Sequence, residues 1–117
     1  MGEQGFTKHA AETLDRLEAD IERSAEEAGV DLELSRQDNV IDIEFEDGSK
    51  VVINSHQAAG EIWVAARSGG YHFRWDGVAW RDTREGDELF AALSKLVSSQ
   101  GGQAVVLGAP KAPRDAP

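Results

Sequence analysis

Three glutamates, Glu18, Glu22 and Glu26, follow one another at four-residue spacing in a stretch whose apolar residues also recur every three or four positions. On a helix, this spacing places the three carboxylates in one row beside the buried edge. Carboxylate oxygens are hard ligands that suit Ca²⁺, Mg²⁺, Mn²⁺ or iron. Because single carboxylates on a convex helix cannot enclose an ion, we expect weak binding of several hydrated cations with poor selectivity. The alternative is a solvated helix face with no ligand.

The negative charge of the chain is concentrated in one segment. Between Glu12 and Asp47 there are fourteen acids and three arginines, whereas the whole chain of 117 residues carries a net charge of -10. That segment therefore accounts for the entire excess, and the acids continue from the expected helix onto the strands that follow it. A charge of this sign argues against nucleic acid and anionic membrane surfaces as partners, and favours cations or basic proteins.

Cysteine is absent from the sequence, which excludes disulfides, thiolate metal sites and a cysteine nucleophile. No apolar run approaches the length of a membrane span, and the first residues resemble neither a signal peptide nor a transit segment. We therefore expect a cytoplasmic protein without a membrane association.

Enzymatic activity has little support in the sequence. A general acid and base pair needs a buried carboxylate with a raised pKa in a cleft, and these acids lie on expected surface stripes. Gly69 and Gly70 lack the Lys-Ser/Thr sequence that follows a phosphate-binding loop, and no Ser-His-Asp order can be singled out. We expect no enzyme; oxidation of ferrous iron at the acids is the most credible alternative chemistry.

The stretch from Lys50 to Trp80 has apolar and polar residues in alternation between short turn-forming pairs. We expect the rest of the chain, including the acidic residues, to be arranged around it. This pattern is typical of an antiparallel meander with one face in the core and one in water. In residues 71–75, the alternation directs Tyr71, Phe73 and Trp75 inward. In residues 61–67, it leaves Trp63 on the open face, with Glu61 and Arg67. An exposed tryptophan is a candidate partner contact, since tryptophan is enriched among binding hot spots.

The remaining elements follow from the same periodicities. The pattern predicts helices over residues 6–29, with Thr7 as a possible N-cap, and 86–100. Strands are expected over 30–34, 40–46 and 50–54, with a turn at 35–39, and a closing strand over 104–107. The fold class is therefore α+β: a two-layer sandwich with two helices packed on one face of a twisted antiparallel sheet. We expect a single domain over residues 1–107 and a disordered proline-containing tail over 108–117.

The sequence resembles the frataxin family, in particular its bacterial, CyaY-type members. The resemblance rests on DGSKVVIN at residues 47–54, on EIWVAARSGGYHFRWDG at residues 61–77 and on Trp80, and it covers the chain except for the tail. It implies an iron-binding protein that docks on the cysteine desulfurase and its scaffold partner and regulates iron-sulfur cluster assembly.

Carried over by position, the resemblance implies two sets of site residues. Iron would be bound weakly, as Fe²⁺ or Fe³⁺, by an acidic ridge formed by Glu18, Glu22, Glu26, Glu27, Asp31 and Glu33, with Asp42, Glu44, Glu46 and Asp47 as further candidates. The partner-facing sheet surface would comprise Asn54, Trp63, Arg67 and His72. The chain departs from the family at three places. Glu61 stands where some bacterial members have glutamine, and Ala58 or Ala59 where some have proline. Around the end of the first helix, where relatives have more aspartates, this chain has Ser24, Ala25 and Gly29.

These observations lead to one expected function and two alternatives. The expected function is an iron-binding regulator and adaptor of cluster assembly that acts as a monomer, with iron-dependent oligomers as an open possibility. The first alternative is a purely electrostatic protein adaptor in which metal has no physiological role, and the second is a ferroxidase. His9, His56 and His72 are expected to be surface histidines rather than metal ligands, and Trp75 and Trp80 to serve packing.

Overall fold

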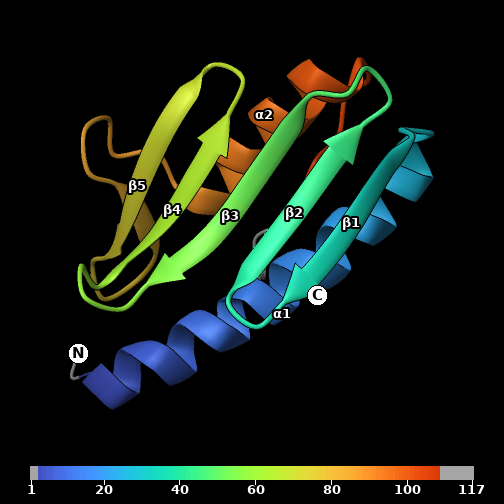
Figure 1. Ribbon diagram of the computed structural model, residues 1–117. Helices are drawn as coiled ribbons and strands as arrows, with labels where there is room; N and C mark the ends of the chain where they lie inside the picture. The colour runs from blue at the N-terminus through green and yellow to red at the C-terminus, as the bar shows by residue number, and fades with distance from the viewer. Residues whose placement is uncertain (1–2, 109–117) are drawn as a thin grey trace, which may run out of the picture.

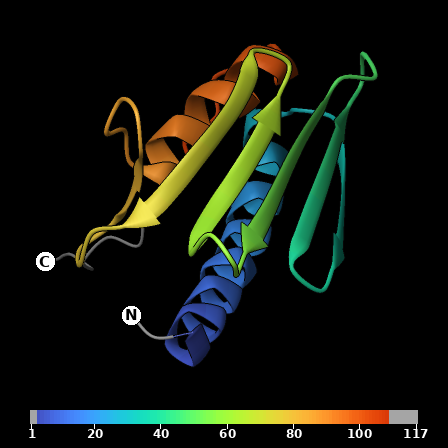
Figure 2. The same ribbon diagram turned by 60° about the vertical axis from the view of Figure 1, so that its left-hand side comes forward.

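The alternating residues in the middle of the chain form one antiparallel sheet whose six strands are neighbours in the order β1-β2-β3-β4-β5-β6. The structure is a computed structural model that describes residues 3–108. Both helices lie on the same side of the sheet, as Figures 1 and 2 show from two directions. The expected α+β sandwich of two helices on one sheet face is confirmed. The elements are α1 (Glu3–Ala28), β1 (Leu32–Gln37), β2 (Val40–Phe45), β3 (Lys50–His56), β4 (Glu61–Ala66), β5 (Gly69–Trp75), β6 (Trp80–Asp82) and α2 (Leu89–Gly101).

The core lies between the sheet and the helices. Because side chains alternate along a strand, each strand contributes every second residue to the core. Ile53 is thus paired with Val64, and Ile62 with Phe73, and all four are at most 2% exposed. The apolar stripe of α1 covers this surface through Leu14, Leu17 and Ile21, which are fully buried, and α2 covers it through Leu89, Leu93 and Val97. The open face of the sheet carries the alternate residues of the same strands, most of which are polar.

The elements differ from expectation mainly at their ends. Helix α1 begins at Glu3, so Thr7 lies inside it and is not its N-cap. Its end agrees with the prediction, since Gly29 has a φ of 75° that glycine adopts at little cost. Strand β1 reaches Gln37, which is paired with Val40, so the expected five-residue turn is wrong. Asp38 and Asn39 alone make the turn, and Asp38 has a φ of 50°, a conformation that aspartate tolerates.

The closing strand expected over residues 104–107 does not form; this segment contains no strand in the structure. Its apolar residues are nevertheless buried, with Val105 at 3% and Leu107 at 4% exposure. Two serines of α2 hold the segment instead of a neighbouring strand. The Ser98 hydroxyl bonds to both backbone groups of Val105, and the Ser94 hydroxyl accepts a hydrogen bond from the Leu107 amide. Side chains of a helix have thus replaced the sheet as hydrogen-bonding partners.

Trp75 and Trp80 serve packing, as expected, in an aromatic cluster with the start of α1. Their ring centroids lie 5.6 Å apart, and Trp80 is 3% exposed. The Trp80 indole N–H donates to the Thr13 hydroxyl at 3.1 Å, which ties β6 to the helix. His9 packs against both tryptophans, at centroid distances of 4.3 and 5.2 Å, and is therefore more enclosed than the expected surface histidine.

Neither described helix is long and apolar enough to cross a membrane. Of the residues expected to form a disordered tail, 108–117, only Gly108 belongs to the part of the chain that the structure describes.

Candidate functional site: an acidic flank and a tryptophan face

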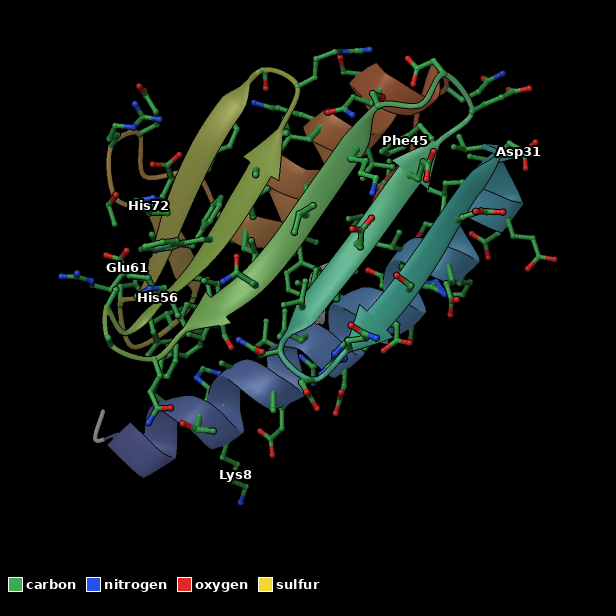
Figure 3. All side chains as sticks on the ribbon, viewed as in Figure 1. Lys8, Asp31, Phe45, His56, Glu61 and His72 are labelled. Atoms are coloured by element: carbon green, nitrogen blue, oxygen red, sulfur yellow. The ribbon has the colours of Figure 1, made fainter. Side chains whose placement is uncertain are left out.

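Acidic side chains line the edge of the molecule where β1 runs beside α1. We call Glu22, Glu26, Asp31, Glu33, Glu44 and Glu46 the acidic flank. Four surface hollows follow one another along this edge and share its residues. Asp31, in the connection from α1 to β1, lines three of the four, and Figure 3 shows its position at that edge. The flank is therefore one continuous surface built from α1, the α1–β1 connection and the outer face of β1 and β2.

Several acids of the predicted ridge are neutralised by nearby cations. Arg36 of β1 donates to Glu18 at 3.1 Å and also to Asp15, and its side chain is only 17% exposed. Lys50 lies 3.5 Å from Asp42, and Arg67 lies 3.1 Å from Asp47. Glu18, Asp42 and Asp47 therefore carry a partner that a visiting cation would have to displace. Within residues 3–108, the six acids of the flank take part in no ion pair.

Along α1, Arg23 forms an ion pair with Asp20, which is 5% exposed. Glu27 is exposed but lines none of the four hollows among the described residues, because it lies one position further around the helix than Glu26. Of the predicted ridge, the structure thus brings together Glu22, Glu26, Asp31, Glu33, Glu44 and Glu46. It places Glu27 outside this group.

The largest hollow lies where the C-terminal ends of both helices meet the β2–β3 turn. Its volume is about 890 Å³, and Glu26, Asp31, Glu46 and Asp47 line it. Helix C-termini carry partial negative charge, so the two helix ends add to the field of these carboxylates. The Ser49 hydroxyl and then its amide donate to Asp47, and with Arg67 they hold the pKa of Asp47 below its usual value. Asp47 thus releases its proton more readily than an ordinary aspartate.

The acids of the flank stand in rows rather than in closed clusters. Glu33 is directly opposite Glu44 across the β1–β2 pair, on the open face, and like charges in that position repel. In the described part of the chain, no three His, Asp or Glu side chains come close enough together to hold a metal ion as a group. Any cation on this surface would therefore keep much of its water shell, as hard cations held by few carboxylates do.

The second surface lies on the open face of β3, β4 and β5, at the other end of the view from Asp31 in Figure 3. Trp63 stands between two histidines: its ring centroid is 4.0 Å from that of His56 and 4.5 Å from that of His72. Both pairs are stacked, with interplanar angles of 14° and 12°. We call His56, Glu61, Trp63, His72 and Arg74 the tryptophan face.

Glu61 organises the tryptophan face. Its Oε1 accepts from the Trp63 indole N–H at 2.8 Å and lies 3.5 Å from Nδ1 of His72. Its Oε2 accepts from Arg74 at 2.7 Å, and the residue is 7% exposed. Burial alone would raise the pKa of Glu61, but the hydrogen bonds from Trp63 and Arg74 and the neighbouring charges outweigh it and hold the pKa below its usual value. Glu61 is therefore an ionised, covered carboxylate.

The remaining predicted partner residues are divided between the two surfaces. Asn54 is paired with Trp63 across β3 and β4, and His72 is paired with Trp63 across β4 and β5. Arg67 follows the end of β4, where its side chain bonds to Asp47 and its amide donates to Gln100 of α2. Arg67 therefore borders the acidic flank and not the tryptophan face.

Sequence reasoning missed the roles of His56, Glu61 and Arg74. A signal was present, because Glu61 and Trp63 alternate onto the same face and His72 falls on the open side of its strand. The missing fact was the register of β3 against β4, which places His56 beside Glu61 and diagonal to Trp63. That register is set by the four-residue turn at 57–60, which alternation alone does not determine.

The fold and these two surfaces define a small α+β protein of the frataxin-like class. The family model described as "Frataxin-like domain" matches residues 1–103 of the chain. The iron-sulfur cluster assembly protein CyaY of Cupriavidus pinatubonensis is 54% identical over 108 residues, which are 92% of this chain and 97% of that protein. CyaY of Janthinobacterium is 52% identical over 92% of this chain and 96% of its own length. The chain therefore belongs to the frataxin family, in the CyaY group of iron-sulfur cluster assembly proteins.

Solved structures agree with this assignment. Frataxin from Psychromonas ingrahamii superposes with a TM-score of 0.77 at 28% identity, over 93% of this chain and all of that one. A trimeric yeast frataxin complexed with ferrous iron superposes with a TM-score of 0.65 at 28% identity, over 80% of this chain and 85% of that one.

Proposed function

We propose that this chain is an iron-binding regulator and adaptor of iron-sulfur cluster assembly rather than an enzyme. The acidic flank would hold iron weakly, and the tryptophan face with Asn54 would dock on the complex of cysteine desulfurase and scaffold. The yeast structure with ferrous iron supports a role for iron in the family. The protein would act in the cytoplasm as a monomer. The trimeric yeast relative suggests oligomers as a further state.

One observation carries the proposal for iron: six carboxylates share a continuous edge, and within residues 3–108 none of them is paired with a cation. Their mutual repulsion favours the arrival of a positive charge, whether an ion or a basic surface of a protein. Hydrated binding by one or two carboxylates at a time supports low affinity and several ions for each chain.

A second candidate function is the purely electrostatic adaptor, in which the flank binds only a basic patch of the desulfurase. The lack of any group of three metal-ligating side chains in the described residues favours it. A protein partner would not need such a group, because complementary surface charge alone steers and orients association.

One experiment separates the two. In the triple variant Glu26→Gln/Asp31→Asn/Glu46→Gln, three acids that share the largest hollow lose their charge. The binding of Fe²⁺ is measured by anaerobic calorimetric titration. The binding of the desulfurase is measured with a surface-binding assay. A matched control removes three exposed acids elsewhere: Glu12→Gln/Glu85→Gln/Asp87→Asn. Loss of both iron and desulfurase binding in the flank variant alone supports the proposed function. Loss of desulfurase binding alone supports the electrostatic adaptor, and equal effects of both variants contradict both.

A further inference from the structure

A small groove lined by aromatic rings lies between the N-terminal half of α1, the β5–β6 connection and the start of α2. Its volume is about 240 Å³, and His9, Trp75, Trp80 and Phe90 line it together with Val78. We call these five residues the aromatic groove. Small-molecule sites usually have volumes of about 300 to 1,000 Å³, so this smaller groove suits a chain segment laid along the surface better than an enclosed ligand.

The aromatic groove has a buried floor and an open rim. Trp80 and Phe90 are 3% and 4% exposed, whereas His9 and Trp75 are half-buried and Val78 is 81% exposed. A single exposed apolar residue needs no partner. Here, however, the exposed valine borders rings that are themselves only partly covered. The groove therefore offers an apolar surface that a segment of chain could cover.

The segment after α2 leads toward this groove. It runs back along the helix, because the Ser98 hydroxyl bonds to Val105 and the Ser94 hydroxyl accepts a hydrogen bond from the Leu107 amide. Two residues of the segment thus pass four residues of the helix, which is about 6 Å. The Ser94 hydroxyl also donates to the Phe90 carbonyl at 2.8 Å, one turn nearer the start of α2. At the same advance, the next two residues would bring the chain level with Phe90.

The arrangement of the helices places the groove at the end of the molecule toward which this segment runs. Both helices run in the same general direction, as Figure 2 shows, and their C-terminal ends line one hollow beside the acidic flank. At the other end of α2, Thr13 of α1 accepts a hydrogen bond from the Trp80 indole at 3.1 Å. A chain that leaves Leu107 toward the start of α2 therefore heads for the aromatic groove and away from the acidic flank.

Residues 109–117, which lie outside the described part of the chain, have the sequence APKAPRDAP. Pro110 and Pro113 are three positions apart, and the polyproline II helix has three residues per turn, so in that conformation both rings would lie on one face. Segments of the form Pro-x-x-Pro dock in this conformation on grooves lined by aromatic side chains. Each of the three prolines follows an alanine. Because proline fixes its own φ and restricts the residue before it, these residues lose little freedom when the segment is ordered.

We propose that the aromatic groove docks residues 109–117 of its own chain, with Pro110 and Pro113 against the rings and Val78 covered. Composition alone predicts disorder for this segment, because it has too few apolar residues to form a core. The groove supplies the apolar surface that the segment lacks. The inference does not depend on the proposed function, since it involves neither the acidic flank nor the tryptophan face.

The short connection favours the segment of the same chain over that of a second copy. Pro110 follows Leu107 by three residues. A linker this short gives an effective concentration on the order of millimolar, so a contact too weak to hold a separate peptide in dilute solution is still made within one chain. Charge contributes little to the choice. Arg16 and Glu88 also line the groove with opposite signs, and both oxygens of Glu88 already accept hydrogen bonds from amides of α2.

Nuclear magnetic resonance of the full chain tests the docking first from the side of the segment. In Pro110→Ala/Pro113→Ala, the indole N–H signals of the two groove tryptophans should shift. The signal of Trp63, which lies on the open face of the sheet, should stay where it is. Pro117→Ala is the matched control, because this proline lies outside the three-residue repeat and its loss should leave all three indole signals in place.

The same docking is tested from the side of the groove. In the wild type, the backbone amide signals of residues 111–116 should differ from those of a free peptide of residues 108–117. In Val78→Ser, which removes the exposed apolar side chain of the rim, these signals should move toward the positions of the free peptide. Val106→Ser is the matched control, because Val106 is similarly exposed, at 79%, and does not line the groove.

Titration of that peptide into a chain shortened to end at Gly108 measures the contact without the tether. The shortened chain keeps every described helix and strand. We expect a dissociation constant on the order of 1 mM, comparable with the effective concentration of the tethered segment. Saturation should restore the indole signals of the full chain. A peptide with Pro110→Ala/Pro113→Ala should bind roughly fivefold more weakly, because it loses both the preformed conformation and the ring contacts.

Several results would overturn the inference. It fails if the amides of residues 111–116 in the wild type already match those of the free peptide. It also fails if Pro110→Ala/Pro113→Ala moves the groove tryptophans no more than Pro117→Ala does. Loss of the docked signals on dilution would identify a second copy as the occupant and would exclude docking within one chain. Signals that do not change with concentration, and that respond to changes on both sides, support the proposal. Circular dichroism of each variant establishes that the fold is retained.

Discussion

The Trp63 indole N–H donates to the carboxylate of Glu61 at 2.8 Å, although the two residues are only two positions apart on β4. Residues at this spacing share a face of the sheet, so a long acidic side chain can turn back along its own strand to reach its neighbour. The hydrogen bond fixes the indole between the two histidines. The orientation of the tryptophan face therefore depends on the carboxylate of Glu61.

Replacing Glu61 should destabilise the fold. In Glu61→Ala, the partly covered Trp63 and Arg74 donors lose their acceptor, and the free energy of unfolding should fall by about 1 to 3 kcal/mol. Glu61→Gln keeps an acceptor and should lose less. Urea denaturation measures both, with the exposed Glu85→Gln as the matched control. A Glu61→Ala protein as stable as the control would show that the network contributes nothing.

The ionisation of Glu61 should also be visible in the pH dependence of stability. Its pKa is lowered in the folded protein, mainly because hydrogen bonds from Trp63 and Arg74 outweigh its burial. The folded state therefore binds the proton less well than the unfolded chain, whose glutamates titrate near pH 4.3. The stability from this carboxylate is fully present above that pH and is lost as the pH falls through the lowered pKa.

The measurement is the difference in free energy of unfolding between the wild type and Glu61→Gln, followed from neutral pH into acid. We expect the advantage of the wild type to shrink with acidification. Asp47 and Asp76 also have lowered pKa values, because of hydrogen bonds from Ser49 and from the Ala79 and Val78 amides, but they are present in both proteins and cancel. A constant difference would contradict the assigned role of Glu61.

Removing charge from the acidic flank should stabilise the protein. Glu33 faces Glu44 directly across β1 and β2, so Glu33→Gln should raise the free energy of unfolding by about 0.2 to 1 kcal/mol. Added salt screens the same repulsion and should raise the melting temperature of the wild type more than that of the variant. Thermal melts of both proteins at low and high salt, with Glu85→Gln as control, provide the check. If Glu33→Gln melts no higher than the control, the acids of the flank are not crowded.

Gly101, the last residue of α2, should not tolerate a side chain. A Cβ at this position would lie 2.8 Å from Cγ1 of Val30 and 3.5 Å from the Phe45 ring. Both neighbours are buried, and the branched Val30 side chain has little freedom to move, so Gly101→Ala should cost about 1 to 3 kcal/mol. Denaturation of Gly101→Ala, Val30→Ala and the double variant tests the cause. The two losses should be less than additive; full additivity would exclude the clash.

Sequence periodicity predicted the layers of the fold because each apolar stripe has only one surface on which to be buried. It placed Phe73 and the α1 stripe in the core and Trp63 on the open face. It failed at residues 104–107. Val105 and Leu107 alternate and are buried as in a strand, although the segment forms no strand. Only the positions of Ser94 and Ser98 on α2, unknown until the helix is placed, decide that the segment bonds to a helix.

The candidate surfaces were predictable to a different extent. The row of Glu22 and Glu26 followed from helical spacing, and its continuation to Glu33 followed from strand alternation. Pairing of Arg36 with Glu18 joins residues 18 positions apart, and no local pattern contains that information. The same is true of His56 beside Trp63, which depends on strand register. Composition and periodicity thus predict which face a residue occupies, but not which opposite charge or ring lies beside it.

The order of strands in the sheet equals their order along the chain, from β1 to β6. Each strand therefore finds its partner within the next few residues, and no pairing waits for a distant part of the polypeptide. Folding rates rise as contacts become more local, so this chain should refold faster than β-sandwiches of similar length whose adjacent strands are far apart in sequence. A nascent chain could assemble its hairpins one after another during synthesis, with α2 the last element needed to close the core.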